Sequence, residues 1–444
     1  MIVLRQALAL LRGRLHELGM AWVLLALCVL FSVLTWSEQQ PSGAAAADAI
    51  AERILAATPH PRVLVAIRDV PDDVALADRL VDRLRSGGAT VVAVAKGGPK
   101  DARDALGRVA AETPGLDVIA GSAASMAWGV FADLGTDFPA LGAPALVRPR
   151  SYRWPNFLKS ENLLNIANQI AVIAILAVGM TLVILTGGID LSVGSIIALA
   201  SVVTAIVVRD WCGGVAAGPG GMLMAGLVGI AVGAACGAVS GGVVVAFGIP
   251  PFIATLAMML VAGGTASLLA RGESVYQLPD GFMWLGRGAD LVGIPNAVVA
   301  MLALYALAQF TMTRTTFGRW VLAVGGNREA ARLSGVPVSA TLVAAYVLSG
   351  ALAALGGVVM ASQLKSGSPN FGQMYELFTI AAVVVGGTSL AGGEGSMIGT
   401  LVGALVTAVI NNGMNLLGIE SYTQRVVLGV VILGAVLVDR IRRR

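Results

Sequence analysis

The stretch that decides the fold is TGGIDLSVGS, residues 186–195, which separates two long apolar runs. The paired glycines Gly187 and Gly188 break the helix before them, and Asp190 or Ser192 is placed to cap the helix after them. Charge at such a break is costly inside a membrane, so Asp190 is alternatively interpreted as part of a gate or an interface. The sequence leaves both interpretations open.

Further apolar runs extend from this break in both directions. Of the 444 residues, 57% are hydrophobic and only 13% are charged, whereas soluble domains are nearer half apolar and a quarter charged. This composition excludes a disordered chain, a coiled coil and a nucleic-acid-binding module, and it argues against a soluble enzyme. The runs have the length that a bilayer requires. They predict ten transmembrane helices, at about 20–36, 165–186, 192–208, 222–247, 251–270, 296–312, 340–362, 377–390, 397–417 and 423–438.

Basic residues predict how these helices are oriented. Arg5, Arg12 and Arg14 precede the first run and place the N-terminus in the cytoplasm. With ten spans, the arginine-rich tail and the basic loop 313–339 lie on the cytoplasmic side as well. The segment from about residue 38 to residue 160 is then extracytoplasmic. A cleaved signal peptide is the alternative interpretation of the first run.

The stretch between the first two runs has the composition of a soluble domain, with 14 basic and 15 acidic residues from Ser37 to Glu161. Strand and helix patterns alternate along it, which predicts a small parallel α/β domain. The expected helices are 44–57, 72–84 and 101–111, and the expected strands are 62–67, 90–95 and 116–120. The predicted organisation is a cytoplasmic N-terminus and first helix at 1–37, an insertion domain at 38–154, and a nine-helix transmembrane domain at 155–444.

The glycine break has a counterpart near the C-terminus. Residues 386–396, GGTSLAGGEGS, follow the pattern of residues 187–195 at offsets of 199 and 201 residues. Two such re-entrant turns suggest a parallel internal repeat, which is a common transporter design; independent glycine turns are the alternative. The turn residues are Gly187, Gly188, Asp190, Ser192, Gly194 and Ser195 in the first, and Gly386, Gly387, Gly395 and Ser396 in the second. A ladder of Gly229, Gly233, Gly237 and Gly241 predicts close helix packing.

The loop 313–339 contains GGNREAARLSGVP, residues 325–337. Asn327 is predicted to cap a short helix that begins at Arg328, Gly335 to end it, and Pro337 to prevent its continuation. A short capped helix on the cytoplasmic face is suited to docking into a partner. The alternative, a plain basic loop, explains the arginines but not the spacing.

Several kinds of chemistry have no motif in the sequence. No phosphate-binding loop, HExxH or CxxC occurs, and no apolar run carries the acidic residues of a proton relay. We therefore expect no catalytic residue, metal site or bound cofactor in this chain, and the energy for uphill transport to come from another polypeptide.

Taken in order, the motifs resemble the permease subunits of bacterial ABC sugar importers of the ribose, xylose and galactose type, a sister family of the branched-chain amino acid permeases. The matching segments cover nearly all of 155–440. They are Phe157-Leu158 with Asn162-Leu163, AVGMT at 177–181, residues 185–195, PPFIATL at 250–256, residues 325–335 and residues 386–399. The insertion at 38–154 departs from the family, which has a short connection there, and Val336 stands where the family usually has Ile.

The resemblance implies a transport subunit of the bacterial inner membrane and not an enzyme. It implies three partners: an ATP-binding subunit that holds ATP and Mg²⁺, a periplasmic binding protein that delivers a monosaccharide, and a second permease copy, identical or not. The implied coupling residues are Arg319, Gly325, Asn327, Glu329, Ala330, Ala331, Ser334 and Gly335. Polar or motif residues that could line the path, or merely join helices, are Asn165, Gln169, Phe252, Thr255, Asn411 and Asn415.

Other functions remain open at this point. A sister permease would carry a branched-chain amino acid, a nucleoside or an autoinducer. A membrane-anchored sensor would use the α/β domain as its active part. A secondary transporter is disfavoured because the spans lack acidic residues.

Overall fold

The computed structural model describes residues 19–112 and 115–442 and divides the chain into two compact units. Trp36–Pro155 forms the first, called here the α/β unit. The chain up to Thr35 and from Asn156 onward forms the second, the membrane unit. The arginines at positions 5, 12, 14, 443 and 444, on which the predicted orientation depends, lie outside the described residues.

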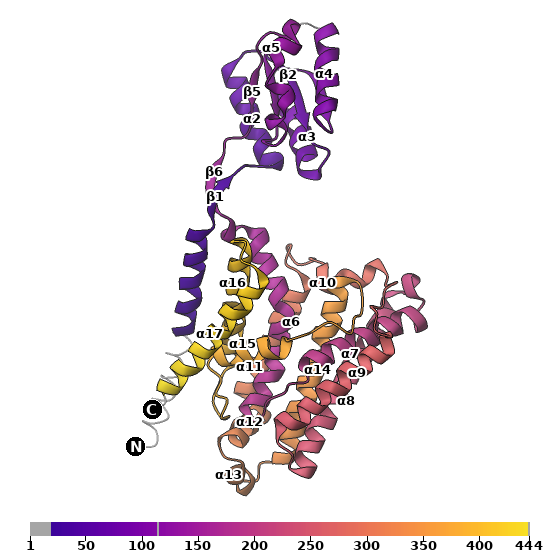
Figure 1. Ribbon diagram of the computed structural model, residues 1–444, viewed down its shortest axis with the longest axis vertical. Coiled ribbons are helices and arrows are strands. Elements are labelled where there is room, and N and C mark those ends of the chain that lie inside the picture. Colours follow the sequence, from indigo (N-terminus) through magenta and orange to yellow (C-terminus); the bar gives the residue numbers. More distant parts are fainter. Residues whose placement is uncertain (1–18, 113–114, 443–444) are drawn as a thin grey trace. The chain divides into compact units, whose positions relative to one another are not determined.

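The α/β unit is built on a four-stranded parallel sheet with the order β3-β2-β4-β5 (Figure 1). The central strand β2 (Arg62–Ile67) is buried along nearly its whole length. Two apolar cores lie on opposite faces of the sheet, one shared with α2 and α3 and the other with α4. The bounds of these elements are α2 Gly43–Ala57, α3 Pro71–Ser86, β3 Thr90–Lys96, α4 Pro99–Glu112, β4 Val118–Gly121 and β5 Ala145–Val147.

A separate antiparallel ladder joins the two ends of the α/β unit. Strand β1 (Trp36–Gln39) pairs with β6 (Tyr152–Pro155), so that Trp36 faces Pro155 and Gln39 faces Tyr152. The ladder brings together segments more than a hundred residues apart in the sequence. Both chain connections to the membrane unit therefore leave from the same point of the α/β unit.

Within the part of the chain that the structure describes, seven helices are long and apolar enough to cross a membrane, and two apolar helices, Gly19–Leu34 and α15 (Tyr375–Val385), are shorter. The number of ten transmembrane helices, expected from the sequence, stays a prediction. The run expected over 377–390 is helical only to Val385, because the glycine turn begins there. The seven are α6 (Ser160–Leu185), α7 (Val193–Ile206, continued to Trp211), α8 (Pro219–Phe247), α9 (Pro251–Ala270), α11 (Asn296–Arg314), α14 (Val338–Leu364) and α16 (Met397–Leu416), and α17 (Ser421–Arg442) follows.

Helices α6 and α14 form the interior of the membrane unit. The second half of α6 is buried nearly all round, as expected of a helix surrounded by others. Helix α14 packs against α6, α7 and α8 (Figure 1). The predicted glycine ladder on α8 makes this packing possible, because a Cβ at Gly233 or Gly237 would overlap the backbone of α14.

Candidate functional site

The two glycine turns lie in contact with each other. The first follows α6 and the second follows α15, and the N–H of Gly393 donates to the carbonyl of Leu185 at 2.9 Å. Both helices end with the same hydrogen bonds, Gly187 N–H to Ile184 O and Gly387 N–H to Val384 O. Equivalent positions are thus 200 residues apart, which corrects the offset of 199 taken from the sequence.

Glycine is required at both helix ends. Gly187 has φ +77° and Gly387 has φ +89°, a left-handed conformation that side chains disfavour. The turns consequently reverse direction within a few residues.

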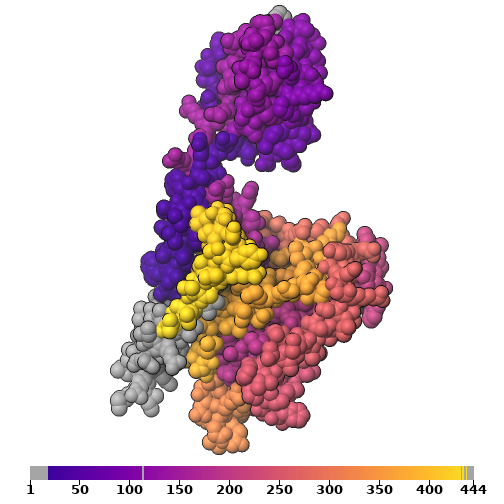
Figure 2. Space-filling view, in the orientation of Figure 1, coloured from indigo at the N-terminus to yellow at the C-terminus, as the bar shows by residue number. Residues whose placement is uncertain are grey.

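The predicted coupling loop is two helices, α12 (Thr316–Gly326) and α13 (Arg328–Leu333). Asn327 caps α13 as predicted, since its Oδ1 accepts from the Ala330 N–H at 2.9 Å. Gly335 ends the segment with φ +79°. Figures 1 and 2 show both helices at one end of the membrane unit, where α13 protrudes.

The junction between α12 and α13 packs directly on both glycine turns. A Cβ at Gly325 would overlap the Leu185 carbonyl on one side and the Gly393 nitrogen on the other. Arg328 reaches the first turn from α13, donating from Nη2 to the Thr186 carbonyl at 3.2 Å. Three segments from distant parts of the sequence therefore meet through backbone contacts.

Two further helices hold the first turn. Asp190, only 1% exposed, accepts from the Ser192 N–H at 3.0 Å and from the Ser349 hydroxyl of α14 at 2.8 Å. Thr255 of α9 donates to the Ile189 carbonyl at 3.1 Å. Ser192 occupies the N-cap position of α7, as predicted, but its side chain makes no capping hydrogen bond. Asp190 ties the turn to α14.

A pocket of about 340 Å³ opens beside the start of α7, a volume within the range of about 300–1,000 Å³ for small-molecule sites. Its walls come from α7, α9 and the segment 369–376. Most of the lining is apolar or glycine, and Ser195, Gln373 and Glu376 supply polar groups. Gly194 is needed there, because a Cβ would overlap the Gly372 carbonyl as well as the Glu376 carboxylate.

None of the six predicted path residues lines this pocket. Thr255 is buried beneath the first turn, whereas Phe252 is 52% exposed. Asn165 and Gln169 lie exposed on α6, and Asn415 accepts from Gln424 of α17 at 2.6 Å. The polar contact between α6 and α16 is made by other asparagines: Asn162 and Asn412 exchange two hydrogen bonds, of 3.0 and 2.9 Å. The predicted residue Asn411 directly precedes Asn412 in the sequence.

The predicted coupling residues divide into buried and exposed groups. Ala331 is buried against Val324 and Leu342. Arg319, Glu329, Ala330, Ser334 and Gly335 are exposed. Sequence reasoning missed Leu333, an apolar side chain 78% exposed on α13. We call the exposed surface of this helix the coupling face: Arg328, Glu329, Ala330, Arg332 and Leu333.

Among the described residues, no group of three His, Cys, Asp or Glu side chains is arranged to hold a metal ion. Apolar helices of membrane-spanning length that pack through glycine, with a small pocket between α7 and α9, are typical of a membrane transport protein.

Residues 162–436 match the family model described as branched-chain amino acid transport system / permease component, and the chain belongs to this family. It is a multi-pass protein of the inner membrane, and it is a transport subunit rather than an enzyme, as the resemblance implied.

Three relatives illustrate the similarity. The ribose import permease protein of Escherichia coli K12 is 47% identical over 289 residues, which is 64% of this chain and 87% of the relative. The ribose import permease protein of Bacillus subtilis 168 is 44% identical over 321 residues, or 70% and 94%. The D-allose transport system permease protein of Escherichia coli K12 is 36% identical over 285 residues, or 64% and 85%. No solved structure matches the chain.

Proposed function

We propose that this chain is the permease subunit of an ATP-driven importer that carries a monosaccharide. Its family is one of permease components, and the relatives described above are named for ribose and allose transport. A pocket with hydroxyl, amide and carboxylate groups suits a small polyhydroxylated solute. The solute passes beside Ser195, Gln373 and Glu376.

The observation that carries the proposal is the close packing of the α12–α13 junction, which leads into the coupling face, on the backbone of both glycine turns. An ATP-binding subunit docks on α13, with Leu333 as the apolar centre of the contact. Movement of α13 is transmitted to both turns through Gly325 and Arg328, and from the first turn to α14 through Asp190. ATP and Mg²⁺ belong to the partner, and this chain binds neither.

The remaining partners follow from the same proposal. A second permease copy completes the path, and a periplasmic binding protein delivers the solute to the outer side. Ten spans place both termini on the ATPase side and the α/β unit on the outer side. The α/β unit then acts at the step of solute delivery.

Replacing Leu333 with Glu tests the docking surface. A carboxylate at the centre of an apolar contact leaves a charge without a partner. We expect co-purification of the ATP-binding subunit and monosaccharide uptake to fall together. The matched control is Val292→Glu, which alters an even more exposed apolar side chain outside the coupling face and should retain the ATPase. Retention of the ATPase by the Leu333 variant would overturn the assignment of α13.

Competition distinguishes the solute classes. Uptake of labelled D-ribose is measured with an excess of L-arabinose, D-allose, L-leucine or a nucleoside. Inhibition by sugars alone supports the proposal, whereas inhibition by leucine or by a nucleoside favours a sister permease.

A further inference from the structure

The α/β unit has the sheet order that creates a crevice. The first strand of its parallel sheet is β2. The next strand, β3, lies on one side of β2, and the chain then crosses to place β4 on the other side. The strand order therefore reverses between β2 and β4. In open parallel sheets, ligands bind outside the carboxyl ends of the strands at such a reversal point.

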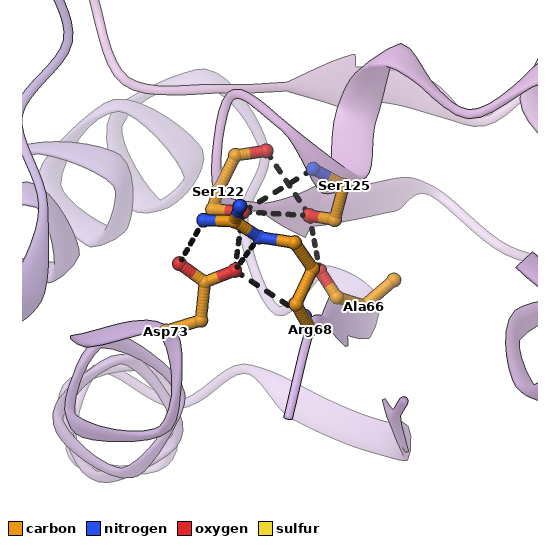
Figure 3. A network of polar contacts seen from close by, with 5 residues as sticks. All are labelled: Ala66, Arg68, Asp73, Ser122 and Ser125. Carbon is orange, nitrogen blue, oxygen red and sulfur yellow. Dashed lines mark hydrogen bonds and ion pairs between the residues drawn. The ribbon is translucent and has the colours of Figure 1, made fainter. Parts of the chain in front are cut away.

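A buried polar network occupies this point (Figure 3). Arg68 follows β2, and its Nε and Nη2 donate to the two oxygens of Asp73 at 2.9 and 3.1 Å. Ser122 follows β4 and donates to the same carboxylate at 2.8 Å. Ser125, fully buried, donates to the Ala66 carbonyl at 2.6 Å. The network thus joins the ends of both strands.

The arginine keeps donors free for a ligand. Arginine has five N–H groups, and two of those on Arg68 are bonded to Asp73. The Asp73 side chain is 3% exposed, whereas that of Arg68 is 46% exposed. The buried carboxylate consequently fixes the guanidinium in one orientation while the rest of the Arg68 side chain stays exposed at the carboxyl end of β2, as in pre-organised sites.

The carboxyl edge of the sheet carries charges of both signs. Lys96 at the end of β3 is paired with Asp69 at 3.1 Å. Asp72 and Asp101 add negative charge in the first turns of α3 and α4. The carboxyl edge therefore carries charges of both signs, because Lys100 adjoins Asp101 and Arg68 is paired with Asp73. Fixed donors and acceptors lie side by side there. A neutral ligand with several hydroxyl groups matches it, because each hydroxyl both donates and accepts a hydrogen bond.

We propose that the carboxyl edge of β2 and β4 in the α/β unit is a binding site for a neutral monosaccharide, with Arg68 as its principal donor. The choice of a monosaccharide among polyols rests on the proposed function. The site lies within the α/β unit and is distinct from the membrane pocket beside α7.

Equilibrium titration of the purified full-length protein with D-ribose, D-allose and L-arabinose tests the site. We expect saturable binding of one of them, weakened at least about tenfold in Arg68→Lys, which keeps a cation beside Asp73 but removes the planar fork. The matched control is Arg79→Lys: Arg79 is also bonded by two nitrogens to a carboxylate, Asp48, and is 49% exposed. Control binding should equal that of the wild type.

Three outcomes would overturn the proposal: no binding of these sugars, equal loss in both variants, or tighter binding of inorganic phosphate than of any sugar. A lysine at position 68 could still donate to the sugar, so sugar binding is also measured for Arg68→Gln, which removes the cation. Hydrogen exchange of β2 and β4 shows whether this variant is folded. Failure here is distinguishable from failure of the proposed function. Sugar uptake without binding at Arg68 overturns only this site, whereas sugar binding without ATP-dependent uptake overturns only the importer.

Discussion

Gly325 and Gly326 are neighbours, yet only the first lacks room for a side chain. A Cβ at Gly325 would overlap the backbone of both glycine turns, whereas a Cβ at Gly326 meets nothing within 4 Å. Gly325→Ala must therefore separate α12 from the turns. We expect it to abolish most solute uptake while the ATP-binding subunit still co-purifies, because the coupling face is unchanged.

Gly326→Ala is the matched control and should transport normally. Uptake and ATPase co-purification are measured for both variants at equal expression. Normal uptake by the Gly325 variant would show that the tight junction does not transmit movement.

Asp73 makes the α/β unit sensitive to acid. Burial raises the pKa of this carboxyl, but hydrogen bonds from Arg68 and Ser122 outweigh burial and hold the pKa below its usual range. A carboxylate with a lowered pKa stabilises the folded state above the unfolded pKa of about 3.9, and this contribution is lost as the pH falls through the folded pKa. Protection of β2 and β4 against hydrogen exchange should therefore decline below about pH 4.

Asp73→Asn tests that dependence. The variant should lose about 1–3 kcal/mol at neutral pH, because Arg68 and Ser122 lose a charged acceptor, and its stability should vary less with acid. Asp48→Asn removes an exposed partner of Arg79 and Arg83 and should change stability by no more than about 1 kcal/mol. An unchanged acid response in Asp73→Asn would contradict the assignment.

At the scale of elements, local signals were predictable and non-local ones were not. The cap at Asn327 and the glycine face of α8 are set by residues close in the sequence, and both could be predicted. Helix α12 was missed because it follows α11 after a single residue, Thr315. The signal was present: Thr315 caps α12 by accepting from the Gly318 N–H at 3.3 Å.

Contacts between distant segments could not be found from one sequence. The β1–β6 ladder and the hydrogen bond from Ser122 to Asp73 depend on which strands become neighbours. The predicted path residues failed to gather at the pocket for the same reason. Periodicity places Asn165 and Asn411 on their helices but does not determine which helix faces which.

The packing of α8 on α14 depends on its glycine face. Gly237→Ala places a Cβ against the Tyr346 carbonyl, so the helices must move apart, at a cost of about 1–3 kcal/mol. Gly242→Ala lies on the same helix with nothing within 4 Å and should be neutral. The stabilities of the two variants are compared by thermal unfolding in detergent. Equal stability would show that the close approach of α8 to α14 is not required.

At the scale of the whole molecule, the chain combines two separately packed units. The membrane unit has its own core, and the α/β unit has its two apolar clusters. Within the membrane unit, the Phe157 N–H donates to Thr35 Oγ1 at 3.1 Å. The two points at which the chain leaves and re-enters the membrane unit therefore lie together. The α/β unit is thus an insertion that the membrane unit does not need in order to close.

Excising the insertion tests this separation. Gln39 and Tyr152 are paired at the last position of the β1–β6 ladder, so replacing residues 40–151 with Asn-Gly converts the ladder into a hairpin. We expect the shortened chain to fold and to retain the ATP-binding subunit, because the coupling face is untouched.

Uptake should fall several-fold at low solute concentration and recover at high concentration, since the insertion acts on delivery. The full-length Arg68→Lys variant should show the same concentration dependence in milder form. Full uptake by the shortened chain at every concentration would assign the α/β unit to a role outside transport.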